Sequence, residues 1–298
     1  VNADGSFGCD LRYQGYEICD GKYNLKGLPA VYAAEEEAQT LIIYMKDQVT
    51  GLQVELLYGV LPEYDVITRS AKVINTEEDK IRLTKAQAAC IDFVHGEFDV
   101  ISFYGRHAME RNMQRTSVGH GAFVIGSRRG TSSHQYNPMM ILAEKETTED
   151  AGTCYGMSFV YSGGFKAEVE KDQFGQTRMQ MGLQEEQFSY PLKKGEEFVI
   201  PEVILTCSNQ GLEKLSQNLQ RCIRKNLCRG KYKEKVRPVL INSWEACYFD
   251  FTGEDIYHLA EQAKDLGIDM VVLDDGWFGS RNDDNSGLGD WKVNEEKL

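Results

Sequence analysis

The pattern of hydrophobic positions divides the chain into two parts. From residue 1 to 207, short segments alternate apolar and polar residues and are separated by clusters of Gly, Asp and Asn. Such alternation, rich in β-branched residues, is typical of half-buried strands. The absence of a fixed repeat argues against a propeller, so this part predicts a large antiparallel β-sandwich. The clearest predicted strands cover residues 52–58, 65–73, 154–161 and 198–205.

The period of the pattern changes after residue 207. Apolar residues then recur at helical spacing, and Ser208 or Asn209 can cap the helix that they predict. The apolar stripe consists of Leu212, Leu215, Leu219, Cys222 and Ile223. A basic stretch over 221–235 follows, as expected for cations near a helix C-terminus. The sequence predicts that residues 208–235 form a helical linker between two domains.

A compact β-α-β unit follows the linker. Residues 238–244 and 268–273 are apolar runs that predict strands, and Thr252 and Gly267 begin and end a helix between them. A helical crossover places two such parallel strands side by side. Ligands bind at the carboxyl ends of such strands in α/β barrels and doubly wound sheets. A barrel needs about 250 residues, so if these strands belong to a barrel, residues 236–298 correspond to roughly its first quarter.

Four side chains at the ends of these strands are the candidate site residues. Asp274 and Asp275 follow the second strand, Trp244 ends the first, and Trp277 lies just after the aspartates. Taken alone, an Asp-Asp-Gly turn is most often only a turn. Carboxylates accept hydrogen bonds from hydroxyls, and indole rings cover apolar faces of sugars, so the combination predicts a sugar site. Adjacent carboxylates approach a sugar from one side, which assigns them to recognition and not to bond cleavage.

Charge and composition narrow the choice of partners and cofactors. The net charge of −13 argues against nucleic acid, and the apolar runs are too short for a membrane helix. The loop 281–291 does not fit a calcium-binding loop, the five histidines form no zinc motif, and the glycines form no dinucleotide motif. We therefore expect no cofactor and no metal, and we expect loop 281–291 to be solvated or to act as a lid.

The eight cysteines bear on the cellular compartment. They are scattered and include no C-x-x-C pair, which is typical of thiols that stay reduced. No signal peptide is visible at the start, although the chain does not begin with Met. We predict a cytoplasmic protein, and we expect that an N-terminal piece is missing.

Two basic segments stand out in this acidic chain, at residues 105–115 and 126–134. They predict loops that pack against an acidic surface of the other domain or of a neighbouring subunit. Exposed loops without such a contact fit the sequence equally well. A direct role of these segments in chemistry has the least support.

Several motifs together resemble family 36 glycoside hydrolases, the microbial α-galactosidases. They occur in the family's order over most of residues 60–291, which is more specific than any single motif. The first group comprises R-P-V-L-I-N-S-W-E-A at 237–246, L-D-D-G-W-F-G at 273–279 and L-G-D-W at 288–291. The second comprises Y-G-R-H at 104–107, G-S-R-R-G at 126–130, S-S-H at 132–134, N-P at 137–138 and Y-S-G at 161–163.

The resemblance implies a large N-terminal β-supersandwich, here residues 1–207, then a (β/α)8 TIM barrel that begins at residue 236, and then a C-terminal β domain. Such enzymes remove terminal α-linked galactose from raffinose- and melibiose-type oligosaccharides by a retaining double displacement. By analogy, Asp274 and Asp275 bind the 4- and 6-hydroxyls of galactose, and Trp244 and Trp277 line the pocket. The analogy also implies a tetramer.

The resemblance places the catalytic aspartates on later barrel strands, which have no counterpart among these residues. We therefore expect a fragment with no catalytic residue of its own that does not hydrolyse galactosides alone. Two alternatives remain open: a raffinose-synthase-like galactosyl transferase on the same scaffold, and a non-catalytic carbohydrate-binding β-sandwich. Product analysis with raffinose separates hydrolysis from transfer. Galactoside binding that survives Asp274→Ala and Asp275→Ala would indicate the binding module.

Overall fold

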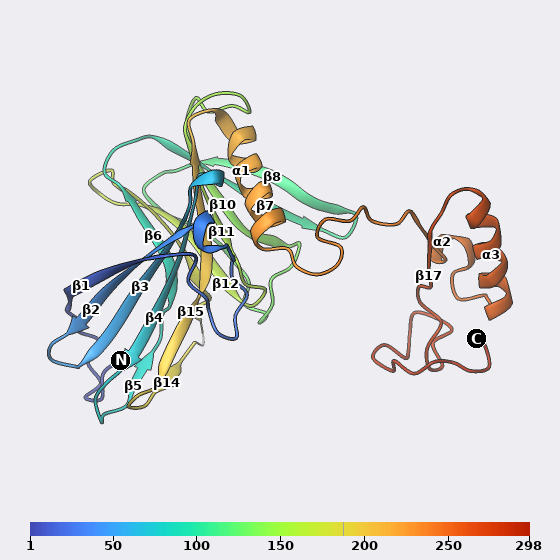
Figure 1. The fold of residues 1–298 in the computed structure, drawn as a ribbon, viewed down its shortest axis with the longest axis horizontal. Helices are drawn as coiled ribbons and strands as arrows, with labels where there is room; N and C mark the ends of the chain where they lie inside the picture. Colours follow the sequence, from blue (N-terminus) through green and yellow to red (C-terminus); the bar gives the residue numbers. More distant parts are fainter. Residues whose placement is uncertain (187) are drawn as a thin grey trace. The chain divides into compact units, whose positions relative to one another are not determined.

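The computed structural model describes residues 1–186 and 188–298. The chain divides into two compact units, Val1–Cys228 (unit 1) and Arg229–Leu298 (unit 2), and each is described by itself (Figure 1). Unit 1 is mostly antiparallel β-sheet, and unit 2 combines short strands with helices. Within the described residues, we find no helix with the length and apolar character that a membrane crossing requires.

A nine-stranded antiparallel sheet forms the larger layer of unit 1. Its strands are β1 (Leu11–Asp20), β2 (Gln39–Asp47), β3 (Leu52–Leu61), β4 (Val66–Asn75), β7 (Phe98–Arg106), β8 (Met109–Ser117), β10 (Tyr136–Glu144), β11 (Cys154–Phe159) and β15 (Glu197–Ser208). Their order across the sheet is β1-β2-β3-β4-β15-β11-β10-β7-β8. Two groups of strands, early and late in the chain, therefore meet on either side of β15.

A four-stranded antiparallel sheet forms the second layer of unit 1. It contains β6 (Gln87–Phe93), β13 (Thr177–Leu183), β12 (Phe165–Lys171) and β9 (Gly121–Gly126), in that order. A small additional pair joins β5 (Ile81–Leu83) to β14 (Tyr190–Leu192). Short 3-10 turns lie at Glu35–Glu37 and Pro62–Tyr64. The mostly antiparallel β architecture predicted for this part of the chain is confirmed.

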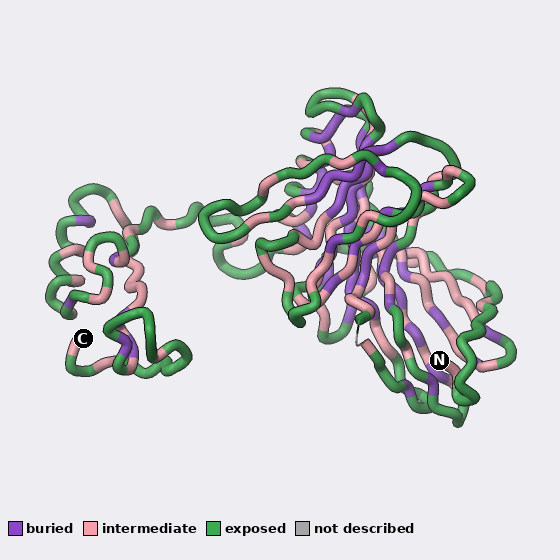
Figure 2. Tube along the Cα trace, turned by 180° about the vertical axis from the view of Figure 1, so that it is seen from behind, coloured by how far each residue is buried: buried purple, intermediate pink, exposed green. Residues whose placement is uncertain are grey.

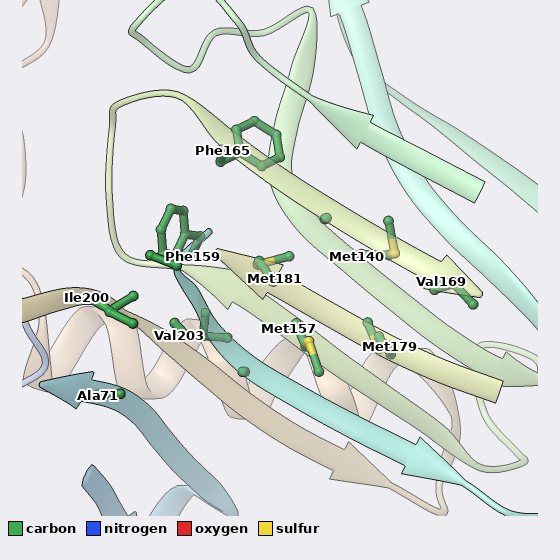
Figure 3. Close-up of a cluster of buried hydrophobic side chains, with 14 of the residues drawn as sticks. Ala71, Met140, Met157, Phe159, Phe165, Val169, Met179, Met181, Ile200 and Val203 are labelled. Atoms are coloured by element: carbon green, nitrogen blue, oxygen red, sulfur yellow. The ribbon is translucent and has the colours of Figure 1, made fainter. Parts of the chain in front are cut away.

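The main hydrophobic core of unit 1 lies between the two sheets (Figure 3). Alternation on β12 buries Phe165, Ala167 and Val169 completely, because successive side chains of a strand point to opposite faces. These residues share one buried cluster with Met140 and Met157 of the larger sheet. Methionine side chains have flexible shapes and fill irregular gaps in such cores.

The central strands of the larger sheet are buried on both faces (Figure 2). On β10, Met140 and Leu142 face the core between the sheets, whereas Ile141 and Ala143 belong to a second cluster. The helix α1 (Gly211–Asn226) supplies apolar residues to this second cluster. These are Leu212, Leu215, Leu219 and Cys222. The helix therefore covers the face of the sheet opposite the four-stranded layer.

The packing of α1 changes the predicted boundary between the domains. The sequence predicts a linker over residues 208–235, but α1 belongs to unit 1, which extends to Cys228. An amphipathic helix must bury its apolar stripe, and the outer face of the sheet provides the partner. The helix also begins later than predicted: its N-cap is Gln210, and the Ser208 hydroxyl accepts a hydrogen bond from the Gln210 N–H (2.9 Å).

Unit 2 contains the predicted β-α-β arrangement in a short form. The strands β16 (Leu240–Asn242) and β17 (Met270–Val272) pair in parallel, with α2 (Trp244–Cys247) and α3 (Gly253–Asp265) between them. Thr252 caps α3 through a reciprocal pair of hydrogen bonds with Asp255, and Gly267 follows the helix at φ +77°. One prediction is wrong in detail: Trp244 begins α2 and does not end the strand, because β16 already ends at Asn242.

The basic segments lie in unit 1. Residues 105–115 fall in the hairpin of β7 and β8, and 126–134 begin at the last residue of β9 and continue into the loop after it. Within the hairpin, Arg115 pairs with Asp99 (2.7 Å) and donates to the carbonyls of residues 144, 145 and 147. In the second segment, Arg128 pairs with Glu186 (2.7 Å). Part of this positive charge is therefore matched by carboxylates of unit 1 itself.

Candidate functional site

The candidate site lies at the carboxyl ends of β16 and β17. Asn242 is the last residue of β16 and is in register with Val272, the last residue of β17. Asp274 follows β17 by two residues, and the N–H of Ser243 donates to the carbonyl of Val272 (3.0 Å). The parallel pairing therefore brings the two chain segments together at the edge where the sequence predicted them to meet.

Asp274 is held by three neighbours. Its Oδ2 accepts a hydrogen bond from Asn242 Nδ2 (2.7 Å), and its Oδ1 accepts one from the N–H of Asp275 (2.8 Å). Its own N–H donates to the hydroxyl of Ser243, which is fully buried (3.1 Å). Each carboxylate oxygen has two lone pairs, so each keeps one acceptor position after these bonds. The carboxylate is fixed in direction and can still receive a ligand hydroxyl.

Asn242 also belongs to the candidate site, although its sequence context alone does not single it out. While its Nδ2 donates to Asp274, its Oδ1 accepts the N–H of Trp244 (2.8 Å). One amide therefore connects two of the predicted site residues, which are 30 residues apart in sequence. The signal that could have found it is its position as the polar residue that ends an apolar strand. The turn after Asn242 lets both the Nδ2 and the Oδ1 of its side chain form hydrogen bonds. The sequence does not reveal the conformation of this turn.

Asp275 forms a bidentate ion pair with Arg281. The Nε and one terminal nitrogen of the guanidinium donate to the two carboxylate oxygens at 2.9 Å each. The Arg281 side chain is only 5% exposed, whereas that of Asp275 is 24% exposed. The hydrogen bond to Asp275 raises the pKa of Arg281 above its ordinary value. The composition of residues 281–291 predicts a solvated or lid-like loop, but Arg281, its first residue, is buried and bound to Asp275.

Gly276 allows the chain to turn directly after the two aspartates. Its φ is +90°, a conformation that residues with a side chain rarely adopt. A Cβ atom there would lie 3.1 Å from the Phe249 ring and 3.3 Å from the Phe251 ring. Both the backbone conformation and the close aromatic neighbours therefore require glycine at this position.

The tryptophans fall into two aromatic groups. Trp244 packs edge-on against Tyr248 and Phe249, with ring centroids 5.2 and 5.0 Å away. Trp277 stacks on Trp291 at 6.5 Å with an interplanar angle of 25°, and it also contacts Phe278. Trp244 is thus joined to the aspartates through Asn242, whereas Trp277 belongs to the aromatic group that includes loop 281–291.

The arrangement can accept hydrogen bonds, but its two carboxylates are adjacent residues on one turn. Glycosidases need two carboxyl groups on either side of the bond, about 5–5.5 Å apart in retaining enzymes and about 6.5–9.5 Å apart in inverting ones. Within residues 1–186 and 188–298, no group of three His, Cys, Asp or Glu side chains is arranged to hold a metal ion. All eight cysteines are free thiols. The Asp274 and Asp275 carboxylates can accept hydrogen bonds at the positions that Asn242, Arg281 and the backbone leave open.

Known proteins similar to this chain are enzymes that act on galactosides. The bifunctional alpha-galactosidase/sucrose kinase AgaSK of Mediterraneibacter gnavus is 64% identical over 297 residues, covering 100% of this chain and 32% of that protein. Alpha-galactosidase AgaA of Geobacillus stearothermophilus is 45% identical over 296 residues, covering 99% of this chain and 41% of AgaA. The chain thus spans about a third to two fifths of the length of these relatives.

Solved structures of the same two relatives are similar to this chain over its whole length. The galactosidase domain of AgaSK superposes with a TM-score of 0.96 over 100% of this chain and 41% of that one. The crystal structure of AgaA gives 0.97 over 100% of this chain and 42% of that one, at 45% identity. A family model of the glycosyl hydrolase family 36 N-terminal domain matches residues 1–193, and a melibiase model matches residues 197–298. Because the family 36 model covers more than half of the chain and the melibiase model covers most of the rest, the chain belongs to glycosyl hydrolase family 36.

Proposed function

We propose that this chain is the galactose-recognition part of an α-galactosidase. The observation that carries the proposal is the pair Asp274 and Asp275 at the carboxyl end of β17, fixed by Asn242 and Arg281. Ligands of α/β sheets bind at this end of the strands. The relatives named above are α-galactosidases, and variants of AgaA have been crystallised in complex with raffinose and with stachyose.

The chemistry of the aspartates suits galactose. Galactose differs from glucose by an axial 4-hydroxyl, so fixed acceptors aimed at that hydroxyl discriminate between the two sugars better than an apolar pocket does. In our proposal, Asp274 and Asp275 bind the 4- and 6-hydroxyls, and Trp244 and Trp277 line the same pocket. The four residues then recognise the terminal galactose of raffinose- and melibiose-type oligosaccharides.

Bond cleavage requires carboxylates that this pair does not supply. We propose that the nucleophile and the acid/base of a retaining double displacement lie on later barrel strands of a longer enzyme. Unit 2 is then the start of a (β/α)8 barrel, and unit 1 is the N-terminal β-supersandwich. The longer enzyme is a cytoplasmic homo-oligomer in this proposal, and the eight free thiols agree with a reducing compartment.

The test uses the longer enzyme that contains this chain, with 4-nitrophenyl α-galactoside as substrate. Asp274→Asn and Asp275→Asn should each lower kcat/KM by roughly 10- to 150-fold, since a hydrogen bond to a charged group contributes about 1.5–3 kcal/mol. Asp265→Asn is the matched control, because Asp265 is exposed at the end of α3. The chain of residues 1–298 alone should release no nitrophenol.

Three outcomes contradict the proposal. Turnover by residues 1–298 alone would place the catalytic groups inside the chain. Galactoside binding and hydrolysis that both survive Asp274→Asn and Asp275→Asn would move recognition elsewhere. Longer oligosaccharides in place of free galactose, formed from concentrated raffinose, would identify a transferase.

A further inference from the structure

Arg281 is a buried cation whose contacts all lie beside the candidate site. Its side chain is 5% exposed, and its guanidinium carbon lies 5.7 Å from the centre of the Phe249 ring. The Nε and one terminal nitrogen bind Asp275, while the other terminal nitrogen donates to the carbonyl of Ser286 (2.6 Å). A buried guanidinium needs partners for its donors, and these contacts pair three of its five N–H groups, while Asp284 Oδ1 lies 3.9 Å from one terminal nitrogen.

The bidentate geometry fixes more than the distance between the two side chains. Two parallel N–H···O bonds hold the carboxylate in the plane of the guanidinium, which a lysine ammonium cannot do. The bond to Ser286 holds the guanidinium in turn, so the plane of the Asp275 carboxylate is set by loop 281–291. Because Asp275 is 24% exposed, the acceptor positions that Arg281 leaves open can still receive a ligand hydroxyl.

Asp274 provides an internal contrast. It follows the same strand, but its carboxylate is held by the neutral amide of Asn242 and by a backbone N–H. The two adjacent carboxylates therefore have different side-chain partners, although Asp274 also accepts the backbone N–H of Asp275. Disturbing Arg281 should change the direction of Asp275 and leave the hydrogen bonds of Asp274 in place.

We propose that Arg281 is a positioning residue that orients Asp275 toward one hydroxyl of the bound galactose. The inference rests on the proposed galactose-recognition function and adds a separate role for loop 281–291. If Arg281 acts through Asp275, its loss must affect the same hydroxyl as the loss of Asp275 does. A merely structural role would weaken the enzyme for every substrate alike.

The experiment compares three substrates of the longer enzyme: 4-nitrophenyl α-galactoside and its 4-deoxy and 6-deoxy analogues. Asp275→Asn identifies the hydroxyl that Asp275 binds, because kcat/KM should fall for the substrates that keep this hydroxyl and stay nearly unchanged for the analogue that lacks it. Arg281→Lys should reproduce this pattern, with a loss of about 10- to 100-fold where the hydroxyl is present, as for a displaced binding group. The Arg281→Lys/Asp275→Asn double variant should be no worse than Asp275→Asn alone.

Arg178→Lys is the matched control. Arg178 makes the same bidentate pair with Asp92, at 2.6 and 2.9 Å, but on the four-stranded sheet of unit 1, where both side chains are 52% exposed. This variant should change kcat/KM by less than about twofold for all three substrates, because exposed pairs contribute little. It also controls for the general effect of replacing a bidentate arginine.

Three results would overturn the inference. The first is an equal loss of kcat/KM on all three substrates with Arg281→Lys. The second is a loss of kcat/KM that depends on the hydroxyl that Asp275 does not bind. The third is a double variant in which the losses of the two single variants add fully. If Arg281→Lys does not fold, the neutral double variant Arg281→Gln/Asp275→Asn replaces it. The inference is then overturned if the ratios of kcat/KM among the three substrates differ between this double variant and Asp275→Asn. Wild-type enzyme that is inactive on the galactoside refutes the proposed function instead, so the two failures are distinct.

Discussion

Asp47, at the end of β2, organises a turn through backbone hydrogen bonds. Its Oδ2 accepts the N–H of Asp10 (2.7 Å), and its Oδ1 accepts those of Val49 (2.8 Å) and Thr50 (3.0 Å). These bonds favour the ionised form of the Asp47 carboxyl group and lower the pKa of Asp47 from 3.8 to about 2. One carboxylate thus ties the start of the chain to the turn between β2 and β3.

Asp47→Asn should lower the melting temperature of residues 1–298 at pH 7, because an amide oxygen cannot replace all three carboxylate bonds. The folded pKa lies below the unfolded one, so the wild-type bonds stabilise the fold above about pH 4 and lose this effect as the pH falls through 2. The variant should therefore lose less stability between pH 4 and pH 2 than the wild type. Thermal unfolding followed by circular dichroism measures both effects.

Asp150→Asn serves as the control, because Asp150 is exposed. It should keep the wild-type melting temperature at pH 7 and the wild-type dependence on pH. Identical pH dependence of Asp47→Asn and the wild type would contradict the role assigned to the three backbone bonds.

The residue types of the candidate site could be predicted from sequence, but their partners could not. Paired carboxylates and tryptophans at the ends of apolar runs have few chemical uses, so Asp274, Asp275 and Trp244 stand out from the sequence pattern alone. Asn242 and Arg281 do not, because their importance depends on which atoms they meet after the turns form. Arg281 in particular lies in a polar loop whose composition favours solvent exposure, and its burial is explained by contacts with Asp275, Ser286 and Phe249 that the sequence does not reveal.

At the level of elements, α1 is joined to the larger sheet by close packing of Leu215. This side chain is fully buried, and its Cδ2 lies 3.2 Å from the point where a Cβ on Gly156 of β11 would be. Gly156 therefore leaves the space that Leu215 fills. The helical period of α1 was visible in the sequence, but its packing partner is a strand more than 50 residues earlier, which local pattern cannot indicate.

Leu215→Ala should lower the free energy of unfolding of residues 1–298 by about 2–5 kcal/mol, because it removes buried methyl groups and leaves a cavity. Urea unfolding followed by circular dichroism measures the change. Gln220→Ala on the exposed side of α1 should change it by less than about 0.5 kcal/mol. A loss below about 1 kcal/mol for Leu215→Ala would mean that α1 is not part of the cooperative core of unit 1.

At the level of the whole molecule, the buried apolar residues are distributed very unequally between unit 1 and unit 2. The three hydrophobic clusters found among the described residues are made entirely from unit 1. The buried apolar side chains of unit 2 are Phe251, Ala263 and Phe278. A small unit with so few buried apolar residues gains little hydrophobic stabilisation by itself.

Residues 1–228 should therefore fold alone, with a melting temperature within about 3 °C of that of residues 1–298. Residues 1–207, which end where the sequence analysis placed the domain boundary, lack α1 and expose the outer face of the sheet. This shorter piece should melt well below 1–228 or aggregate, and residues 229–298 alone should show no cooperative transition. Equal stability of 1–207 and 1–228 would restore the boundary at residue 207.

The order of strands in the larger sheet has a consequence for synthesis of the protein. β15 pairs with β4 on one side and with β11 on the other, although it is the last strand of unit 1 to be made. On the ribosome, β1 to β4 emerge before β15 and keep an unpaired edge at β4 until β15 follows. Unpaired edges promote association between chains, and distant strand pairings form slowly. The nascent chain should therefore depend most on chaperones while residues 76–208 are still being translated.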